Sequence, residues 1–300
     1  MRKVGVIGMG HVGVTVAYTL LTKGIVDELV CIDCNEKKET AEFYDFVDAS
    51  AVLPTHTTIK ANDYQELIDA DIIVTAFGDI SLSAKGGSRF GELELNAKNA
   101  KEVGLKLKEI NYQGIILNIS NPCDVVCQLL QHYTGLPKEK VFGTGTSLDT
   151  ARMKRALAMN FDIDGQNVGG FVLGEHGDSQ FTAWSTVTLN ELSLNEDGLN
   201  LAQLEEDTRN GAWVIIDGKG YTSYGIATCA VNIIQAIFSN AHQLLVVSCY
   251  LEQYNTYIGY PALVGNDGIH KNIQLPLTDE EERKLHDSAE TILSKVNQYL

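Results

Sequence analysis

The chain has 300 residues, of which 44% are hydrophobic and 21% are charged. This composition is typical of a folded globular protein, and the length predicts two domains rather than one. The formal net charge of -16 would repel phosphate backbones and anionic lipid, so we expect neither nucleic acid nor a membrane surface as a partner. An anionic small molecule would need a local cluster of cations in so acidic a protein.

The N-terminus carries two basic residues and then runs directly into glycines, which does not match a secretion signal. We therefore expect a cytoplasmic protein whose six cysteines are free thiols. Cys31 and Cys34 form a C-x-x-C pair, and Cys123 and Cys127 lie four residues apart. No histidine stands at ligand spacing beside the C-x-x-C pair, so we expect no metal site.

The first half of the chain alternates short β-branched runs with helical stretches. Strands are predicted at residues 3–7, 28–33, 71–77, 114–119 and 140–142. The stretch from 91 to 110 predicts a helix with one apolar face that can pack on a sheet. Such alternation predicts an α/β domain with a doubly wound parallel sheet, the Rossmann arrangement, over residues 1–142.

Beyond about residue 143 the pattern changes. Longer helices are predicted near residues 147–159, 201–216 and 221–240, and strand-like runs follow at 244–251 and 257–264. Asn266-Asp267-Gly268 is a hairpin turn signal, which predicts antiparallel pairing there. Thr278 and Glu281 form a capping box that opens a final helix. We therefore predict a second domain of the α+β class over residues 143–300.

A glycine motif at residues 8–13 directly follows the first predicted strand and opens a helix. In a dinucleotide-binding site, Gly8 would allow the tight turn, Gly10 the approach of a pyrophosphate, and Gly13 the close packing of helix on sheet. The helix N-terminus would then face the phosphates. The predicted cofactor-binding residues of this motif are Gly8, Gly10, His11, Val12 and Gly13. A glycine turn without a ligand is the alternative.

Asp33 lies twenty residues after Gly13, at the end of the second predicted strand. A carboxylate there can accept hydrogen bonds from both ribose hydroxyls, and it would repel a 2'-phosphate. The predicted cofactor is therefore NAD rather than NADP.

Three further motifs carry polar groups. Asn121, in Ser120-Asn121-Pro122, follows a strand and so lies at the edge where open parallel sheets bind ligands. Asp149 and Arg152 are three residues apart on one face of a predicted helix. His176 stands between glycines in the segment from Gly174 to Asp178. Taken singly, these motifs are more typical of a turn, a surface ion pair and a structural histidine.

In their order and spacing, the motifs resemble those of the lactate/malate dehydrogenase family along nearly the whole chain. The resemblance implies that His176 donates a proton to a substrate carbonyl while NADH delivers hydride to the same carbon. Asp149 would orient the imidazole and favour its protonated form. Arg152 would hold the substrate carboxylate through two parallel hydrogen bonds. Arg89 matches the family's loop arginine, which binds the substrate and polarises its carbonyl.

The resemblance has three further implications. Asn121 would contact both cofactor and substrate, residues 143–300 would form the substrate and catalytic domain, and the protein would be a homodimer or homotetramer.

NAD-dependent glycosidases share the fold but need a metal site of cysteine and histidine, and neither Cys123 nor His176 lies in such a motif. A non-catalytic NAD-binding sensor would have lost the acid–base pair, which is present here.

The predicted substrate is a small 2-oxo acid. Malate dehydrogenases carry a second arginine in the loop that contains the substrate-binding arginine, here Arg89. Residues 78–88 of this loop contain no arginine, although Lys85 could substitute for it. The loop is longer than in lactate dehydrogenases and offers Ile80 and Leu82. The segment from 218 to 225 replaces the usual G-A-T-Y-Y-G, with Thr222 at the side-chain pocket and a small Ser223 beside it.

The sequence of these segments resembles the L-2-hydroxyisocaproate dehydrogenase branch of the family, so we predict branched or bulky substrates such as 2-oxoisocaproate. The alternative is an L-lactate dehydrogenase that fructose 1,6-bisphosphate does not activate. Lys154 and Gly169 stand where activated enzymes carry an arginine and a histidine, so we expect no such activation in either case.

Overall fold

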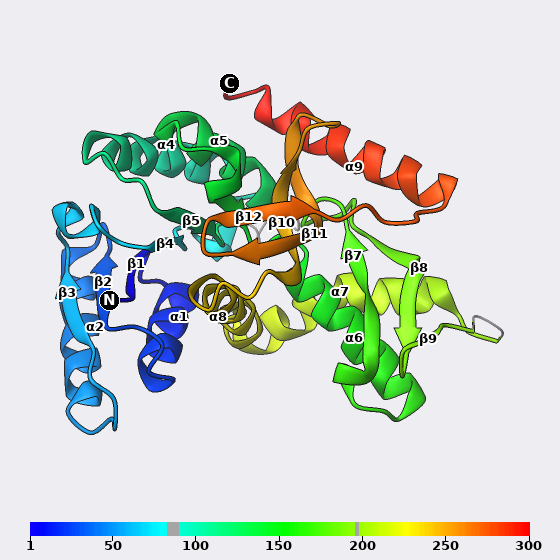
Figure 1. Cartoon of the computed structure of the whole chain (residues 1–300), viewed down its shortest axis with the longest axis horizontal. Helices are drawn as coiled ribbons and strands as arrows, with labels where there is room; N and C mark the ends of the chain where they lie inside the picture. Colours follow the sequence, from blue (N-terminus) through cyan, green and yellow to red (C-terminus); the bar gives the residue numbers. More distant parts are fainter. Residues whose placement is uncertain (83–89, 196–197) are drawn as a thin grey trace.

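The computed structural model describes residues 1–82, 90–195 and 198–300, and it contains two sheets. The large sheet has the strand order β12-β11-β10-β6-β5-β4-β1-β2-β3, and the small sheet has the order β7-β8-β9 (Figure 1). The strands are β1 (Lys3–Ile7), β2 (Glu28–Ile32), β3 (Thr58–Ala61), β4 (Ile72–Thr75), β5 (Ile115–Asn118), β6 (Val141–Gly143), β7 (Val168–Leu173), β8 (Phe181–Leu189), β9 (Leu192–Ser193), β10 (Gln243–Leu251), β11 (Thr256–Gly265) and β12 (Gly268–Asn272).

The described helices cover these sheets. They are α1 (His11–Thr22), α2 (Glu36–Ser50), α4 (Leu93–Glu109), α5 (Cys123–Thr134), α6 (Ser147–Phe161), α7 (Leu201–Lys219), α8 (Tyr224–Phe238) and α9 (Asp279–Val296), with short 3-10 turns at Tyr64–Leu67, Lys138–Lys140 and Gly165–Asn167. In the described part of the chain, none of the helices has the length and apolar character needed to cross a membrane.

The first six strands run parallel; five of them were predicted from the sequence, and β3 at the edge was not. Each neighbouring pair from β3 to β6 is in parallel register, for example Val6 opposite both Cys31 and Val74. Helices α4 and α5 cover one face of this sheet, and α1 and α8 cover the other (Figure 1). The sheet is therefore buried on both faces, which explains the continuous apolar runs of its central strands.

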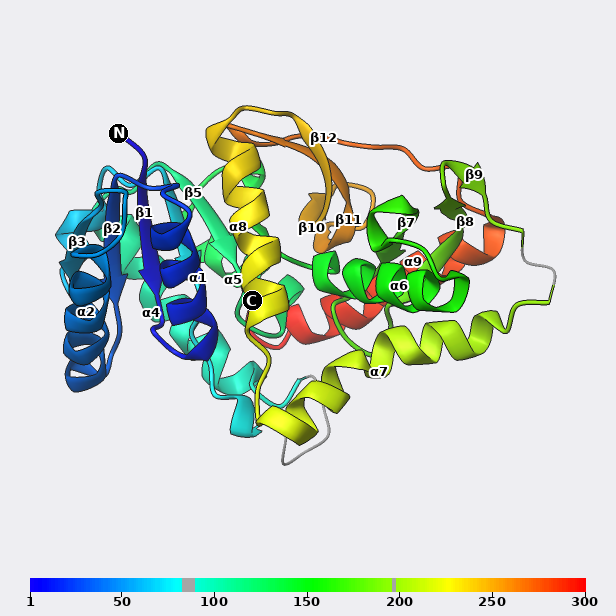
Figure 2. The same cartoon turned by 90° about the horizontal axis from the view of Figure 1, so that it is seen from below.

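The second half of the chain extends the same sheet. Strand β10 pairs antiparallel with β6 at Ser248 and Gly143, and the predicted antiparallel pairing of β10 with β11 and of β11 with β12 is confirmed. One hydrophobic core contains residues from both halves, from Val4 to Val296. A separate small core lies between α6, α7 and the sheet β7-β8-β9 (Figure 2).

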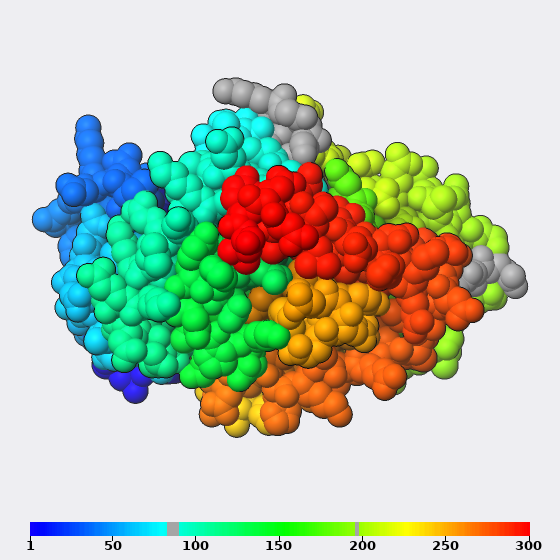
Figure 3. Space-filling view, turned by 90° about the horizontal axis from the view of Figure 1, so that it is seen from above, coloured from blue at the N-terminus to red at the C-terminus, as the bar shows by residue number. Residues whose placement is uncertain are grey.

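The topology gathers loops at one edge of the parallel sheet. The segments that follow β1, β5 and β6 lead into α1, α5 and α6, and α8 packs against α1 beside them (Figure 2). Helix α9 begins at the predicted capping box and lies across α5 and β11, where it covers the junction between the two halves (Figure 3). The polar motifs of the sequence therefore converge at this edge.

Candidate active site

The glycine motif forms a tight turn between β1 and α1. Gly8 has a φ of +101°, and a side chain there would meet the backbone of Ala76. A Cβ at Gly13 would lie 1.9 Å from the carbonyl oxygen of Gly8, so only glycine allows α1 to approach so closely. At Gly10, by contrast, an added Cβ would meet no protein atom within 4 Å. The open space beside the helix N-terminus suits a pyrophosphate.

Two cavities adjoin at Gly10, which lines both of them. One, of about 640 Å³, also includes Gly8 and Asp33 among its lining residues. The other, of about 290 Å³, is lined by His11, Val12 and Asn121 among others. The two cavities share Gly10, Ala76, Phe77 and Gly78, and together they offer space beside the glycine turn for a dinucleotide.

Asp33 follows the end of β2 at the rim of the larger cavity. Its carboxylate accepts hydrogen bonds from the backbone N–H groups of Met9, at 2.6 Å, and Asn35, at 2.8 Å. These bonds fix the carboxylate next to the glycine turn. Because a carboxylate has about four acceptor positions, Asp33 can still accept ribose hydroxyls. The arrangement of Asp33 and the glycine turn fits NAD.

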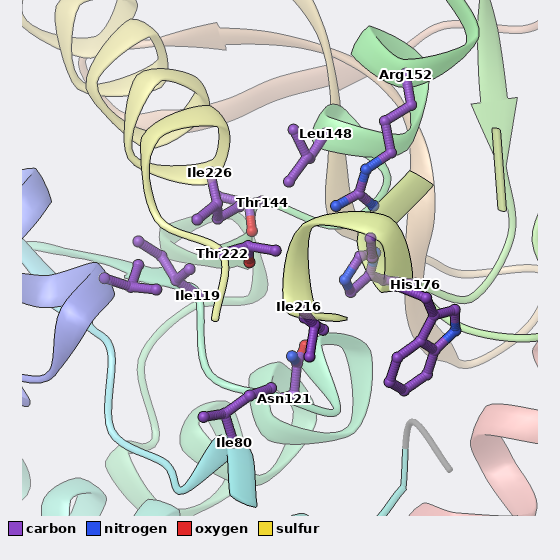
Figure 4. Close-up of a pocket in the computed structure, with 13 residues that line it drawn as sticks. Ile80, Ile119, Asn121, Thr144, Leu148, Arg152, His176, Ile216, Thr222 and Ile226 are labelled. Carbon is purple, nitrogen blue, oxygen red and sulfur yellow. The ribbon is translucent and has the colours of Figure 1, made fainter. Parts of the chain in front are cut away.

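A third cavity, of about 90 Å³, lies next to the second and brings the remaining motifs together (Figure 4). Polar side chains reach it from different elements: Asn121 after β5, Arg152 from α6, His176 after β7 and Thr222 before α8. The other lining residues are Val12, Ile80, Ile119, Thr144, Leu148, Ala212, Trp213, Ile216 and Ile226. The cavity thus combines a few polar groups with a largely apolar wall.

Asp149 connects the two charged motifs. Its Oδ2 lies 2.5 Å from Nδ1 of His176, and its Oδ1 accepts a hydrogen bond of 2.9 Å from Nη1 of Arg152. The Asp149 side chain is 0% exposed, and the side chains of Arg152 and His176 are 6% and 13% exposed. The i,i+3 pair is therefore a buried ion pair rather than a surface one. A buried carboxylate held between two partners orients both of them.

A second carboxylate, Asp124, holds the backbone of the histidine loop. The N–H of His176 donates to Asp124 Oδ2 at 2.9 Å, and Ser248 Oγ donates to Oδ1 at 2.5 Å. Burial raises the pKa of Asp124 to about 6. No role was predicted for Asp124 from the sequence, although it follows Asn121 by three positions. Its contacts span more than fifty residues of sequence, so no local pattern could reveal them.

Two models of protein-family domains match the chain. The model of the lactate/malate dehydrogenase NAD binding domain matches residues 2–143, and that of the lactate/malate dehydrogenase alpha/beta C-terminal domain matches residues 146–300. The chain belongs to the lactate/malate dehydrogenase family. Its cofactor is accordingly NAD.

Similar proteins cover nearly the whole length of this family member. L-lactate dehydrogenase 1 of Bifidobacterium longum subsp. longum is 36% identical over 97% of this chain and 96% of its own length. The L-lactate dehydrogenase of Priestia megaterium is 38% identical over 96% and 93%. The crystal structure of MGS-M5, a lactate dehydrogenase from a Medee basin deep-sea metagenome library, has a TM-score of 0.92 at 33% identity and covers 100% of this chain and 99% of its own.

The residues predicted at the side-chain pocket do not all line the cavity. Thr222 lines it, whereas the small Ser223 beside it is buried, and its hydroxyl accepts a hydrogen bond of 3.0 Å from Lys219 Nζ. Ile80 does line the cavity, whereas Leu82 is 40% exposed. Arg89 and Lys85 lie outside the described residues, as does most of the predicted loop.

All six cysteines of this family member are free thiols. Cys31 is buried in β2, where burial raises the pKa of its thiol, and Cys34 is exposed. Cys123 and Cys127 are buried against Gly143, where a side chain would collide with both sulfur atoms. Within residues 1–82, 90–195 and 198–300, no group of three or more His, Cys, Asp and Glu side chains is arranged to hold a metal ion.

Proposed function

We propose that this family member is an NAD-dependent L-2-hydroxy acid dehydrogenase that reduces small 2-oxo acids. The supporting observation is that one buried carboxylate, Asp149, contacts both His176 and Arg152 at a cavity beside the cofactor space. An acid–base group and a planar cation that share one carboxylate match two parts of the substrate, which are the carbonyl that is protonated on reduction and the negatively charged carboxylate.

In the proposed reaction, bound NADH supplies a hydride to the carbonyl carbon of the substrate. His176 binds Asp149 through Nδ1, which leaves Nε2 to donate a proton to the carbonyl oxygen. The products are a 2-hydroxy acid, NAD and a neutral imidazole, which regains its proton from solvent. Asp149 keeps the imidazole in the required orientation throughout.

Arg152 would bind the substrate carboxylate through its guanidinium fork, which fixes the carbonyl relative to His176. Asn121 and Thr222 line both this cavity and the neighbouring cofactor cavity, so we assign them contacts to substrate and cofactor at the boundary. Arg89 is proposed to polarise the carbonyl, in agreement with the family motif. We assign cofactor binding to residues 1–142, catalysis to residues 143–300, and a homodimer or homotetramer to the assembly.

The first candidate substrate is pyruvate, which would make the protein an L-lactate dehydrogenase. The curated relatives reported above carry that name and are similar over nearly the full chain. These comparisons support lactate more strongly than the branched-acid prediction.

The second candidate is a branched 2-oxo acid, which the composition of the cavity wall favours. Ile80, Ala212, Trp213 and Ile216 present apolar surface next to Thr222. Relative to pyruvate, 4-methyl-2-oxopentanoate adds three carbons, and burial of each CH₂ contributes about 0.8 kcal/mol. The gain could reach about 2.4 kcal/mol, or roughly 50-fold in kcat/KM. Ordering of the loop would reduce it toward about ten-fold.

One assay separates the two candidates. Initial rates of NADH oxidation are measured with pyruvate, 4-methyl-2-oxopentanoate and oxaloacetate, and kcat/KM is compared for the three. A higher value for pyruvate assigns lactate dehydrogenase activity, whereas a roughly ten-fold preference for the branched acid assigns the second candidate. His176→Ala serves as the control for catalysis and should lower kcat by about 10²–10⁴-fold. If no 2-oxo acid is reduced, the proposed function is wrong.

A further inference from the structure

Three side chains form a continuous stack between α1 and the loop that precedes α8. The imidazole of His11 and the ring of Tyr221 are parallel within 2°, with their centroids 3.6 Å apart. Nζ of Lys219 lies 4.5 Å from the Tyr221 centroid. The Tyr221 ring therefore contacts both the imidazole of His11 and the ammonium group of Lys219. We call this set the His11–Tyr221–Lys219 stack.

The stack lies where the cofactor and substrate cavities meet. His11 is the first residue of α1 and directly follows Gly10, the open position of the glycine turn. Tyr221 directly precedes Thr222. His11, Tyr221 and Thr222 line the same cavity of about 290 Å³, and Thr222 also lines the catalytic cavity. The two rings of the stack are therefore attached to the cofactor turn, through His11, and to the wall of the substrate cavity, through Tyr221.

The loop between α7 and α8 is short, and Lys219 at its start contacts residues at its end. Helix α7 ends at Lys219 and is capped by Gly220, whose φ is +86°, and α8 begins at Tyr224. Besides covering Tyr221, Lys219 Nζ donates to Ser223 Oγ and lies 3.7 Å from the Tyr224 centroid. Within this loop, Tyr221 is the residue whose ring meets α1. Stacking on His11 thus restrains the segment that carries Thr222.

We propose that the His11–Tyr221–Lys219 stack positions Thr222 for the substrate and couples the cofactor turn to the substrate cavity. Stacking orders the 220–223 loop, so the free-energy cost of ordering is removed before the oxo acid binds. A dinucleotide on the glycine turn would contact the segment that carries His11 and thereby stabilise the stack. The inference uses 2-oxo acid binding from the proposed function but does not depend on which acid is preferred.

The test uses the full-length protein, four single variants of the two rings, the His11→Ala/Tyr221→Ala double variant and one control variant. His11→Ala and Tyr221→Ala remove one ring each, whereas His11→Phe and Tyr221→Phe keep a stacked pair. Dissociation constants are measured by fluorescence titration, first for NADH and then, with NADH saturating, for oxamate, a 2-oxo acid analogue that is not reduced. KM and kcat for the preferred oxo acid and the melting temperature are measured in parallel. His270→Ala is the matched control, since His270 stacks on His242 at the edge of the large sheet.

An aromatic pair contributes about 0.5–1.5 kcal/mol beyond its buried area, which corresponds to about two- to ten-fold in a binding constant. Both alanine variants should therefore weaken oxamate binding by about two- to ten-fold and raise KM by more than they lower kcat. Both phenylalanine variants should restore oxamate binding to within two-fold of the wild-type constant, and the double alanine variant should be no weaker than either single variant.

Several results would overturn the inference. One is additive loss in the double alanine variant, because the rings would then act independently. Another is failure of both phenylalanine variants to restore oxamate binding. A third is an equal loss in the His270→Ala control. Absence of turnover in the wild-type protein would refute the proposed function instead, since oxamate binding to the NADH complex reports on the stack without any reaction.

Discussion

Substitution of Asp149 by asparagine tests the shared carboxylate at the centre of the site. The amide has the same shape, but it carries no charge, and its NH₂ group cannot accept a hydrogen bond. The variant must therefore weaken the contact to Nδ1 of His176, the contact to Nη1 of Arg152, or both. A hydrogen bond to a charged group contributes about 1.5–3 kcal/mol, which is about 10- to 150-fold for each contact.

The two contacts should affect different kinetic constants. Loss of the bond to His176 disturbs the proton donor and should lower kcat, whereas loss of the bond to Arg152 disturbs carboxylate binding and should raise KM. If both are lost, we expect kcat/KM to fall by about 10²–10⁴-fold. The assay is steady-state NADH oxidation over a range of oxo acid concentrations. Fluorescence titration with NADH shows whether the folded cofactor site is retained.

Asp178→Asn is the matched control for this experiment. Asp178 also lies in the histidine loop, two residues after His176, but its side chain is exposed. It should change kcat/KM by less than two-fold, because exposed charges interact weakly with their surroundings. Comparable losses in the two variants would show that general acidity of the loop, rather than the contacts of Asp149, supports catalysis. A loss below three-fold in Asp149→Asn would refute the argument directly.

Three further predictions follow from other contacts. Asp33→Ala should narrow the preference for NADH over NADPH, measured as the ratio of their kcat/KM values, because the carboxylate that repels a 2'-phosphate is gone; an unchanged ratio would contradict this role. Arg152→Lys should raise KM for the oxo acid about ten-fold or more, because the guanidinium fork is lost. Arg155→Lys, on the exposed face of α6, is the control and should leave KM unchanged. Equal increases of KM in the two variants would exclude Arg152 from substrate binding. Burial raises the pKa of Asp124 in the folded protein to about 6, from an ordinary 3.8. The folded state therefore binds a proton more tightly than the unfolded state, which contributes free energy of unfolding in full below about pH 4 and is lost as the pH rises through 6. The free energy of unfolding of the wild type relative to Asp124→Asn should therefore fall by up to about 3 kcal/mol between pH 4 and pH 7, and parallel urea-denaturation curves across that range would disprove it.

The sequence predicted the elements whose patterns are local. The parallel strands are apolar runs separated by amphipathic helices, and the capping box and hairpin turn each depend on a few neighbouring residues. Edge strand β3 was not predicted, because residues 58–61 are only partly buried and lack a continuous apolar pattern. The pairing of β10 with β6 was also not predicted, since it joins residues more than one hundred positions apart.

The same distinction holds at the site. Asp149 and Arg152 were identified because they share one helical turn, and His176 because glycines flank it in a recognisable motif. The bond from Asp124 to the histidine loop and the stacking of His11 on Tyr221 depend on how distant segments pack. That Ser223 is small follows from the sequence, but its hydrogen bond with Lys219, four residues earlier, was not predicted.

The continuous nine-stranded sheet limits how this enzyme can be rearranged by engineering. Although the family models meet near residue 143, strand β6 ends there while pairing with both β5 and β10. A chimera that joins residues 1–143 to the C-terminal half of a relative must therefore form the pairing of β6 with β10 and the packing of α9 on α5 between segments of different origin. We expect most such exchanges to expose a strand edge and aggregate. Recombination at surface loops within either half should be tolerated far better.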